Sequence, residues 1–196
     1  MKRIVLASNN LGKLREIEAL SEGAIELVAQ SDFNVPPVEE TGLSFVENAI
    51  LKARHAAHHT GLPALADDSG LEVEALNGAP GIYSTRYAGP AASDAQNVEK
   101  LLQALNDIPE HQRRARFQCV MVYLRHADDA TPLISQGSWE GRILFKPQGD
   151  FGFGYDPVFY VPTHRCAAAE LLPAVKNQLS HRAKALRQLA SLLKDT

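Results

Sequence analysis

Two acidic pairs are the residues best suited to holding a divalent cation. Each pair precedes a small polar residue and a glycine, as Glu39-Glu40-Thr41-Gly42 and Asp67-Asp68-Ser69-Gly70. A hard cation such as Mg²⁺ binds a few carboxylates and accepts substrate phosphate oxygens as further ligands. A structural alternative is a solvated loop for the first pair and an Asx turn for the second. The second pair follows an apolar predicted strand, which would place it at a sheet edge where α/β proteins bind ligands.

A loop between a predicted strand and a predicted helix has the composition of a phosphate-binding turn. It reads Ser8-Asn9-Asn10-Leu11-Gly12-Lys13. Unpaired N–H groups at a helix start attract anions, Ser8 and Asn10 can add donors, and Lys13 adds a full positive charge. The segment does not have the Walker A pattern. An ordinary strand-to-helix turn capped by Ser or Asn is the structural alternative.

Two further groups have chemistry suited to a base. Segment 149–157 interleaves three glycines with three aromatic residues, and a purine stacked on such a ring gains about 1–3 kcal/mol. Lys176 and Ser180-His181-Arg182 supply donors for an oxygen on a base or for a phosphate. The structural alternatives are a hairpin with core aromatics and a helix capped by Ser180 with an exposed first turn. Cations at a helix start interact unfavourably with the helix dipole. Their presence at this position therefore favours a role in binding over a purely structural one.

The elements that must position these residues alternate between strands and amphipathic helices, which predicts an α/β fold. Capping boxes at Ser44/Glu47 and Ser93/Gln96 mark two helix starts. Segment 117–124 is apolar on both faces and is predicted to be a central strand of a mixed sheet. The other predicted strands span 4–7, 25–28, 64–66, 71–74 and 133–144, and the predicted helices span 13–20, 44–60, 93–105 and 180–194.

Composition limits the class of protein. The chain has 196 residues, which fits a single domain over 1–196. A net charge of −3 argues against a surface for nucleic-acid polymers. The apolar runs are too short for a membrane span or a signal peptide. Two cysteines, Cys119 and Cys166, cannot build a disulfide framework and favour a cytoplasmic location. Two basic groups are interpreted as surface: His55 with His59, and Arg113 with Arg114 and Arg116.

Taken in order, the motifs resemble the inosine/xanthosine triphosphate pyrophosphatase family, and its bacterial branch in particular. The resemblance covers nearly the whole chain, and the combination of motifs is specific although each one alone is weak. The residues that carry it are Ser8 to Lys13, Glu39 to Gly42, Phe45 to Lys52, Ala66 to Leu71, Gly78 to Ser84, Phe151 to Pro157 and Ser180 to Arg182.

The resemblance implies a fold, a reaction and a set of roles. The fold is an elongated mixed β-sheet flanked by helices, in two lobes with an intervening active cleft, usually as a homodimer. The reaction is Mg²⁺-dependent hydrolysis of ITP, dITP and XTP to the monophosphate and pyrophosphate. Asp68 would be the catalytic carboxylate, and Glu39 and Asp68 would hold the metal. The implied substrate contacts are Ser8, Asn9, Asn10, Leu11, Gly12, Lys13, Ser69, Phe153, Gly154, Tyr155, Asp156, Lys176, His181 and Arg182.

Two positions depart from the family pattern, and two other functions stay open. Asn9 stands where the family often has Gly, and Tyr155 where some members have Trp. One alternative is a related pyrophosphatase that prefers modified pyrimidine nucleotides. The other is a non-catalytic nucleotide sensor, which the pair Asp67-Asp68 disfavours because a sensor needs no general base.

Overall fold

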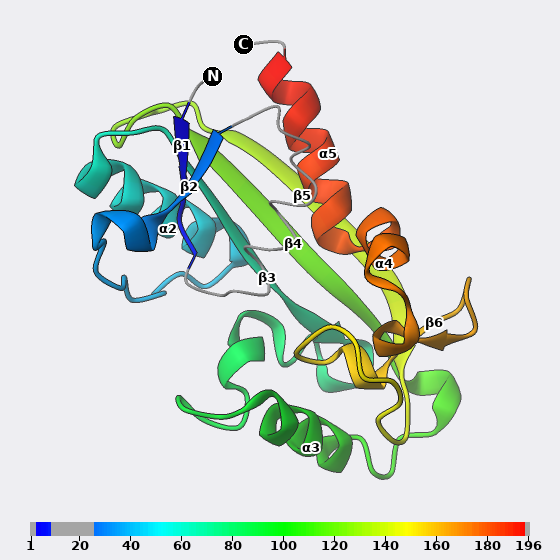
Figure 1. Cartoon of the computed structure of the whole chain (residues 1–196). Helices are drawn as coiled ribbons and strands as arrows, with labels where there is room; N and C mark the ends of the chain where they lie inside the picture. The colour runs from blue at the N-terminus through cyan, green and yellow to red at the C-terminus, as the bar shows by residue number, and fades with distance from the viewer. Residues whose placement is uncertain (1–2, 9–25, 195–196) are drawn as a thin grey trace. The chain divides into compact units, whose positions relative to one another are not determined.

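The structure is a computed structural model that describes residues 3–8 and 26–194. In this part of the chain, seven strands form one sheet in the order β2-β1-β3-β4-β5-β6-β7 (Figure 1). β1 pairs in parallel with β2 and β3, whereas β6 is antiparallel to β5 and β7. The predicted mixed sheet is therefore confirmed. The strands are β1 (Arg3–Leu6), β2 (Glu26–Ala29), β3 (Ala64–Val73), β4 (Arg114–Leu124), β5 (Leu133–Ile143), β6 (Phe159–Val161) and β7 (Cys166–Ala167).

Local sequence signals place the starts of α2 and α3 correctly, whereas α4 was not predicted. Ser44 caps α2 by accepting a hydrogen bond from the Glu47 amide, and Gly61 ends that helix in the left-handed conformation. Ser93 and Gln96 form a complete capping box at the start of α3. None of the described helices is long and apolar enough to cross a membrane. The helices are α2 (Phe45–Thr60), α3 (Asp94–Ala104), α4 (Pro173–Leu179) and α5 (His181–Lys194).

Short 3₁₀ helices connect the larger elements. They are η1 (Gln30–Phe33), η2 (Glu74–Leu76), η3 (Gly81–Arg86), η4 (Glu110–Gln112), η5 (Asp156–Val158) and η6 (Ala168–Glu170). The predicted helix over 13–20 and residues 9–13 of the predicted phosphate loop lie outside the described residues.

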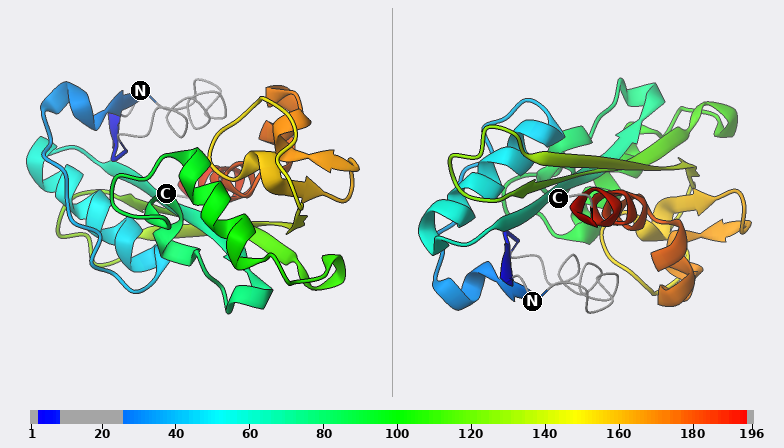
Figure 2. Two further views of the ribbon diagram at one scale, coloured as in Figure 1. Left: turned by 90° about the horizontal axis from the view of Figure 1, so that it is seen from below. Right: turned by 90° about the horizontal axis from the view of Figure 1, so that it is seen from above.

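By its internal contacts the chain divides into two compact units, the first made of residues 1–68, 119–137 and 181–196. In this unit β1 and the part of β4 from Cys119 to Leu124 are buried on both faces, and successive residues alternate between two clusters. Val5, Val120 and Val122 pack on the α2 side, and Leu6 and Met121 pack on the α5 side. α2 and α5 flank β4 in Figure 1, and α5 is seen nearly end-on in the right-hand view of Figure 2. This double burial confirms the prediction of a central strand over 117–124.

The second unit contains residues 69–118 and 138–180. Its core joins one face of its strands to the apolar side of α3, through Val98 and Leu101. Three aromatic rings lie at its centre, and the Phe159 ring is 4.5 Å from Phe117 and 5.3 Å from Trp139 between centroids. Rings at this spacing pack well and bury a large apolar area.

One predicted break in the chain is wrong. Residues 67–70 were expected to form a turn between two strands, but β3 runs without interruption from Ala64 to Val73. The acidic pair therefore lies inside a strand, third of seven in the sheet. The strand predicted over 133–144 is confirmed as the single strand β5, Leu133–Ile143.

Candidate functional site

The candidate catalytic carboxylates occupy consecutive positions of a buried strand. Asp67 is 1% exposed and Asp68 is 6% exposed. Consecutive side chains of a strand point to opposite faces of the sheet. Asp67 continues the row of Leu65 on the α5 side, and Asp68 continues the row of Ala64 and Ala66 on the α2 side. The strand thus presents one carboxylate to each helix.

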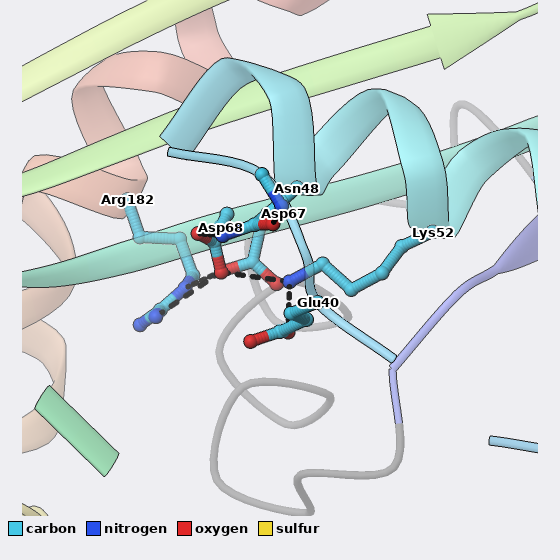
Figure 3. Close-up of polar contacts among 7 residues, drawn as sticks. Glu40, Asn48, Lys52, Asp67, Asp68 and Arg182 are labelled. Atoms are coloured by element: carbon cyan, nitrogen blue, oxygen red, sulfur yellow. Dashed lines mark hydrogen bonds and ion pairs between the residues drawn. The ribbon is translucent and has the colours of Figure 1, made fainter. Parts of the chain in front are cut away.

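Asp68 faces a lysine from α2 (Figure 3). Lys52 Nζ donates to Asp68 Oδ1 at 2.8 Å and to Glu40 Oε1 at 3.0 Å. Asn48 lies one helical turn before Lys52, and its amide nitrogen is 3.5 Å from Asp68 Oδ2. Residues four apart share one side of a helix, so α2 sets both side chains against the same carboxylate.

The Lys52 ammonium carries a full charge at neutral pH despite its burial. Burial lowers the pKa of Lys52, but attraction to Asp68, Asp67 and Glu40 and the hydrogen bond that Lys52 donates to Asp68 outweigh this effect and leave the pKa above its ordinary value. Opposite charges at short range favour the charged form. The centre of this group is therefore a fixed positive charge surrounded by carboxylates.

Asp67 faces the other helix. Arg182 Nε and Nη2 each lie 3.4 Å from Asp67 Oδ2, and both side chains are at most 2% exposed. Arg182 was predicted to contact substrate as part of a base-reading group. The structure places it in a buried ion pair with a carboxylate that sequence reasoning had left without a defined role.

The first acidic pair contributes Glu40 to this centre rather than Glu39. Glu39 is exposed, whereas Glu40 reaches Lys52. Gly42 brings the loop close to α2, because its amide donates to Asn48 Oδ1 at 2.8 Å. A Cβ at Gly42 would lie 2.6 Å from Asn48 Oδ1 and from Glu47 Cβ. A glycine is required at this close approach.

The carboxylates around Lys52 are the donors that a hard divalent cation uses. Asp68 and Glu40 already share one cation, the ammonium, at hydrogen-bond distance. Such oxygen ligands suit Mg²⁺, which binds through one or two carboxylates together with substrate phosphates. Among residues 3–8 and 26–194, no group of three or more His, Cys, Asp or Glu side chains is arranged to hold a metal ion. The carboxylates of Asp68 and Glu40 are donors of the type that fits such a cation.

In the second unit, the predicted aromatic loop is built around Asp156. Asp156 Oδ2 accepts hydrogen bonds from the Phe153 amide at 2.9 Å and from Lys176 Nζ at 2.7 Å. Lys176 Nζ also lies 4.9 Å from the centre of the Phe153 ring, which is within the range of a cation–π contact. Phe153 is half-buried. Three predicted site residues, Phe153, Asp156 and Lys176, are therefore brought together.

Tyr155 anchors this loop. Its ring is 5% exposed, and its hydroxyl donates to the Ser84 carbonyl at 2.7 Å. Burial, with smaller contributions from Tyr87 and Asp94, raises the pKa of Tyr155 far above its ordinary value. The Gly154 amide next to it donates to Asp94 Oδ2 at 2.7 Å. The predicted substrate contacts of Gly154 and Tyr155 stay predictions.

The other predicted site residues are distributed over both units. Ser8 follows β1, with its amide donating to the Leu6 carbonyl at 3.0 Å. Ser69 is half-buried in β3, and His181 is a buried residue at the start of α5. Asn9, Asn10, Leu11, Gly12 and Lys13 lie outside the described residues.

Sequence reasoning did not assign a role to Lys52. The residue was quoted only as the end of the segment Phe45 to Lys52. The sequence did contain a signal for such a role. Lys52 lies four residues after Asn48 on a predicted helix, and this spacing places both side chains on one helix face.

Comparison with known proteins identifies the family. The family model for the Ham1 family matches residues 4–192. The chain belongs to the Ham1 family. The match takes in nearly every residue, including both units and the two groups built on Asp68 and Asp156.

Relatives and solved structures of the Ham1 family agree over full length. The chain is 60% identical to a dITP/XTP pyrophosphatase of Vibrio cholerae, covering 100% of this chain and 98% of that protein. It is 57% identical to a dITP/XTP pyrophosphatase of Shigella flexneri, covering 100% of both. The structure of a HAM1 protein from Coxiella burnetii superposes with a TM-score of 0.93 at 53% identity, covering 100% of both chains. The Staphylococcus aureus Ham1 protein has a TM-score of 0.88 at 43% identity over 99% of both chains.

Proposed function

We propose that this chain hydrolyses non-standard purine nucleoside triphosphates, namely ITP, dITP and XTP, to the monophosphate and pyrophosphate. The observation that carries the proposal is Asp68, a carboxylate held in a buried strand against Lys52 and Glu40. Relatives at about 60% identity over full length are named dITP/XTP pyrophosphatases, which supports this substrate class.

Asp68 acts as the general base in this proposal. It takes a proton from water, the water oxygen forms a bond to the α-phosphorus, and the bond from that phosphorus to the bridging oxygen breaks to release pyrophosphate. Lys52 holds the Asp68 carboxylate in place through its hydrogen bond, and Asn48 lies beside the second oxygen. A base positioned in this way contributes about 10²–10⁴-fold to a rate.

Mg²⁺ is the proposed metal, and Asp68 and Glu40 are its proposed ligands. Glu40 takes the place proposed for Glu39 from the sequence, because it is Glu40 that shares the Lys52 ammonium with Asp68. When bound, the metal would neutralise phosphate charge that builds up during the reaction. Lys13, with the helix-start amides of the predicted phosphate loop, is proposed to add positive charge at the triphosphate.

The group around Asp156 is proposed to hold the nucleoside. The half-exposed Phe153 ring offers a stacking face, and Lys176 supplies a donor for the oxygen at position 6 of hypoxanthine or xanthine. Adenine carries an amine donor at this position, so a fixed donor would be left unpaired, and mismatches of this type reject a substrate by about 10⁴-fold or more. His181 and Arg182 are proposed to assist, with Arg182 positioned by Asp67.

A pyrophosphate-release assay tests the proposal. The purified chain is given ITP, XTP, dITP, GTP and ATP with Mg²⁺, and separately with EDTA. We expect inosine monophosphate and pyrophosphate from ITP, little turnover of ATP and none with EDTA. Release of inosine diphosphate and inorganic phosphate would contradict the proposed bond cleavage. Lys176→Ala should reduce the preference for ITP over ATP, and an unchanged preference would remove Lys176 from base selection.

Location and assembly complete the proposal. We place the enzyme in the cytoplasm, where the nucleotide pool lies, and this agrees with Cys119 and Cys166 not being joined in a disulfide. We also propose a homodimer, and light scattering on the purified chain would measure its mass directly.

A further inference from the structure

The turn that carries Phe153 is fixed by hydrogen bonds at three consecutive residues. The Phe153 amide donates to Asp156 Oδ2, the Gly154 amide to Asp94 Oδ2, and the Tyr155 hydroxyl to the Ser84 carbonyl. The first acceptor belongs to the same turn and the third is a main-chain carbonyl. Asp94 is different, because it is a carboxylate supplied by another element, the first residue of α3.

Asp94 is not needed to cap its own helix. Ser93 Oγ accepts from the Gln96 amide, and Gln96 Oε1 accepts from the Ser93 amide at 2.8 Å, which completes the capping box without Asp94. The helix itself is anchored in the core of the second unit through Val98 and Leu101. The Asp94 carboxylate therefore belongs to a helix that is fixed in the core, and it accepts a hydrogen bond from the Gly154 amide.

Gly154 needs such a partner. It has a φ of +61°, and a Cβ added there would meet nothing within 4 Å. The side of Gly154 on which a Cβ would lie is therefore open, and glycine has many alternative backbone conformations. A hydrogen bond to an ionised carboxylate is shorter and stronger than one between neutral groups. The 2.7 Å bond to Asp94 fits this description.

We propose that Asp94 is a positioning residue for nucleoside binding. Its carboxylate fixes the Gly154 peptide and so sets the orientation of the neighbouring Phe153 ring, which Lys176 contacts. The inference rests on the proposed function of the Phe153 and Lys176 group. It predicts that loss of the Asp94 acceptor weakens nucleotide binding and leaves the chemical step at Asp68 unchanged.

Four variants separate this role from a structural one. Asp94→Ala removes the acceptor, whereas Asp94→Asn keeps an amide oxygen that can accept the same bond. Ser93→Ala weakens the helix cap and leaves Asp94 in place. Glu99→Ala removes a carboxylate from the exposed side of the same helix, where it accepts a hydrogen bond from the Gln103 side chain. Each variant is compared with the wild type in Mg²⁺-dependent hydrolysis of ITP.

We expect Asp94→Ala to raise the KM for ITP about tenfold, equal to about 1.4 kcal/mol, with kcat within twofold of the wild type. Asp94→Asn should restore the KM to within about threefold. Ser93→Ala and Glu99→Ala should leave the KM within twofold. A loss confined to KM is the signature of binding that is equal in the ground and transition states. An unchanged KM in Asp94→Ala, or an equal rise in Ser93→Ala, would overturn the inference.

Hydrogen exchange gives a second measurement that does not depend on activity. Peptides covering 149–157 should exchange about tenfold faster in Asp94→Ala than in the wild type, with Asp94→Asn close to the wild type. Unchanged exchange would overturn the positioning role even in an active enzyme. Failure of the proposed function is recognised separately, because the wild type itself would then release no pyrophosphate from ITP.

Discussion

Asp67 and Asp68 are neighbours in sequence, yet their carboxylates serve opposite faces of the sheet. Asp67 Oδ2 lies 3.4 Å from the Arg182 guanidinium on one side, and Asp68 Oδ1 lies 2.8 Å from the Lys52 ammonium on the other. Each buried carboxylate therefore has a cation of its own, which offsets part of the cost of burying it. The arrangement predicts different consequences when either acid is replaced.

Asp68→Asn should keep nucleotide binding but lose turnover by about 10²–10⁴-fold, because an amide cannot take the proton from the attacking water. Pyrophosphate release measures the turnover, and calorimetric titration with ITP measures the binding. Near-normal turnover in this variant would remove Asp68 from the mechanism.

Asp67→Asn should mainly lower the free energy of unfolding. The Arg182 guanidinium would stay buried without its carboxylate, and breaking a buried pair in this way costs about 3–5 kcal/mol. Urea unfolding measures the loss, and a double-mutant cycle with Arg182→Met isolates the pair. A stable Asp67→Asn enzyme with the turnover defect of Asp68→Asn would instead assign Asp67 to the chemistry.

Local signals were sufficient to predict much of the fold. The caps at Ser44 and Ser93 and the end of α2 at Thr60 appeared where predicted, because a cap depends on residues within one helical turn. The double burial of residues 117–124 in β4 was also visible, since a segment that is mostly apolar on both faces leaves no face for water. The strand through Asp67 and Asp68 was missed because charged residues in sequence resemble a turn. Their cations come from α2 and α5, far away along the chain.

Arg113 was misassigned for a related reason, because its partners too are seen only in the folded structure. Arg113 was interpreted as charged surface together with Arg114 and Arg116, but Arg113 is 1% exposed. Its partners are main-chain carbonyls at residues 105, 108, 143 and 144. Carbonyls are present at every residue, so no side-chain pattern could indicate them. The resemblance implied Glu39 as the metal ligand of the first acidic pair, and only the folded loop shows that Glu40 is the residue of the pair that reaches Lys52.

Gly152→Ala should disrupt the nucleoside-binding loop. Gly152 has a φ of +80°, and a Cβ there would lie 2.1 Å from Asp156 Oδ2, the atom that accepts from Lys176. We expect the KM for ITP to rise about tenfold or more, as Asp156 is displaced. Gly78→Ala is the matched control, since Gly78 has a φ of +88° but open space around the added Cβ. Gly78→Ala should show only the cost of backbone strain, about 1–2 kcal/mol. Equal KM values in the two variants would contradict the role of the close contact between residue 152 and Asp156.

Arg113→Met should destabilise the second unit strongly. The Arg113 guanidinium donates to the carbonyls of Leu105, Ile108, Ile143 and Leu144, and so ties the end of α3 to the end of β5. Burial lowers the pKa of Arg113, but arginine stays charged at all ordinary pH values. Because each buried carbonyl left without a donor costs about 1–3 kcal/mol, we expect a loss of about 3 kcal/mol or more in urea unfolding.

Arg116→Met is the control for Arg113→Met. Arg116 pairs with Glu72 at 2.7 Å, but about half of its side chain is exposed. Exposed ion pairs contribute about 0–1 kcal/mol. If both variants lost the same stability, the four carbonyl contacts of Arg113 would not be the source of its effect.

Asp129 should make the stability of the first unit depend on pH in the acid range. Its buried carboxylate accepts hydrogen bonds from the Arg125 guanidinium, the Arg125 amide and the Thr131 amide. The Arg125 side chain is the main cause that holds the pKa of Asp129 far below its ordinary value, although burial opposes the shift. A lowered pKa in the folded state means that the unfolded chain takes up the proton first as the pH falls.

The contribution of Asp129 is therefore complete above the unfolded pKa of about 3.9 and is lost as the pH falls from there through the folded pKa. We expect Asp129→Asn to be less stable than the wild type at pH 7, with a difference that stays constant to about pH 5 and narrows below about pH 4. Urea unfolding across this range measures it. Asp128→Asn is the matched control, because the neighbouring Asp128 is exposed, and it should give no comparable difference. If the difference in the free energy of unfolding between Asp129→Asn and the wild type grew towards low pH, the ionised carboxylate could not be its source. Protonation of Asp129 can only remove the stability that its charge contributes.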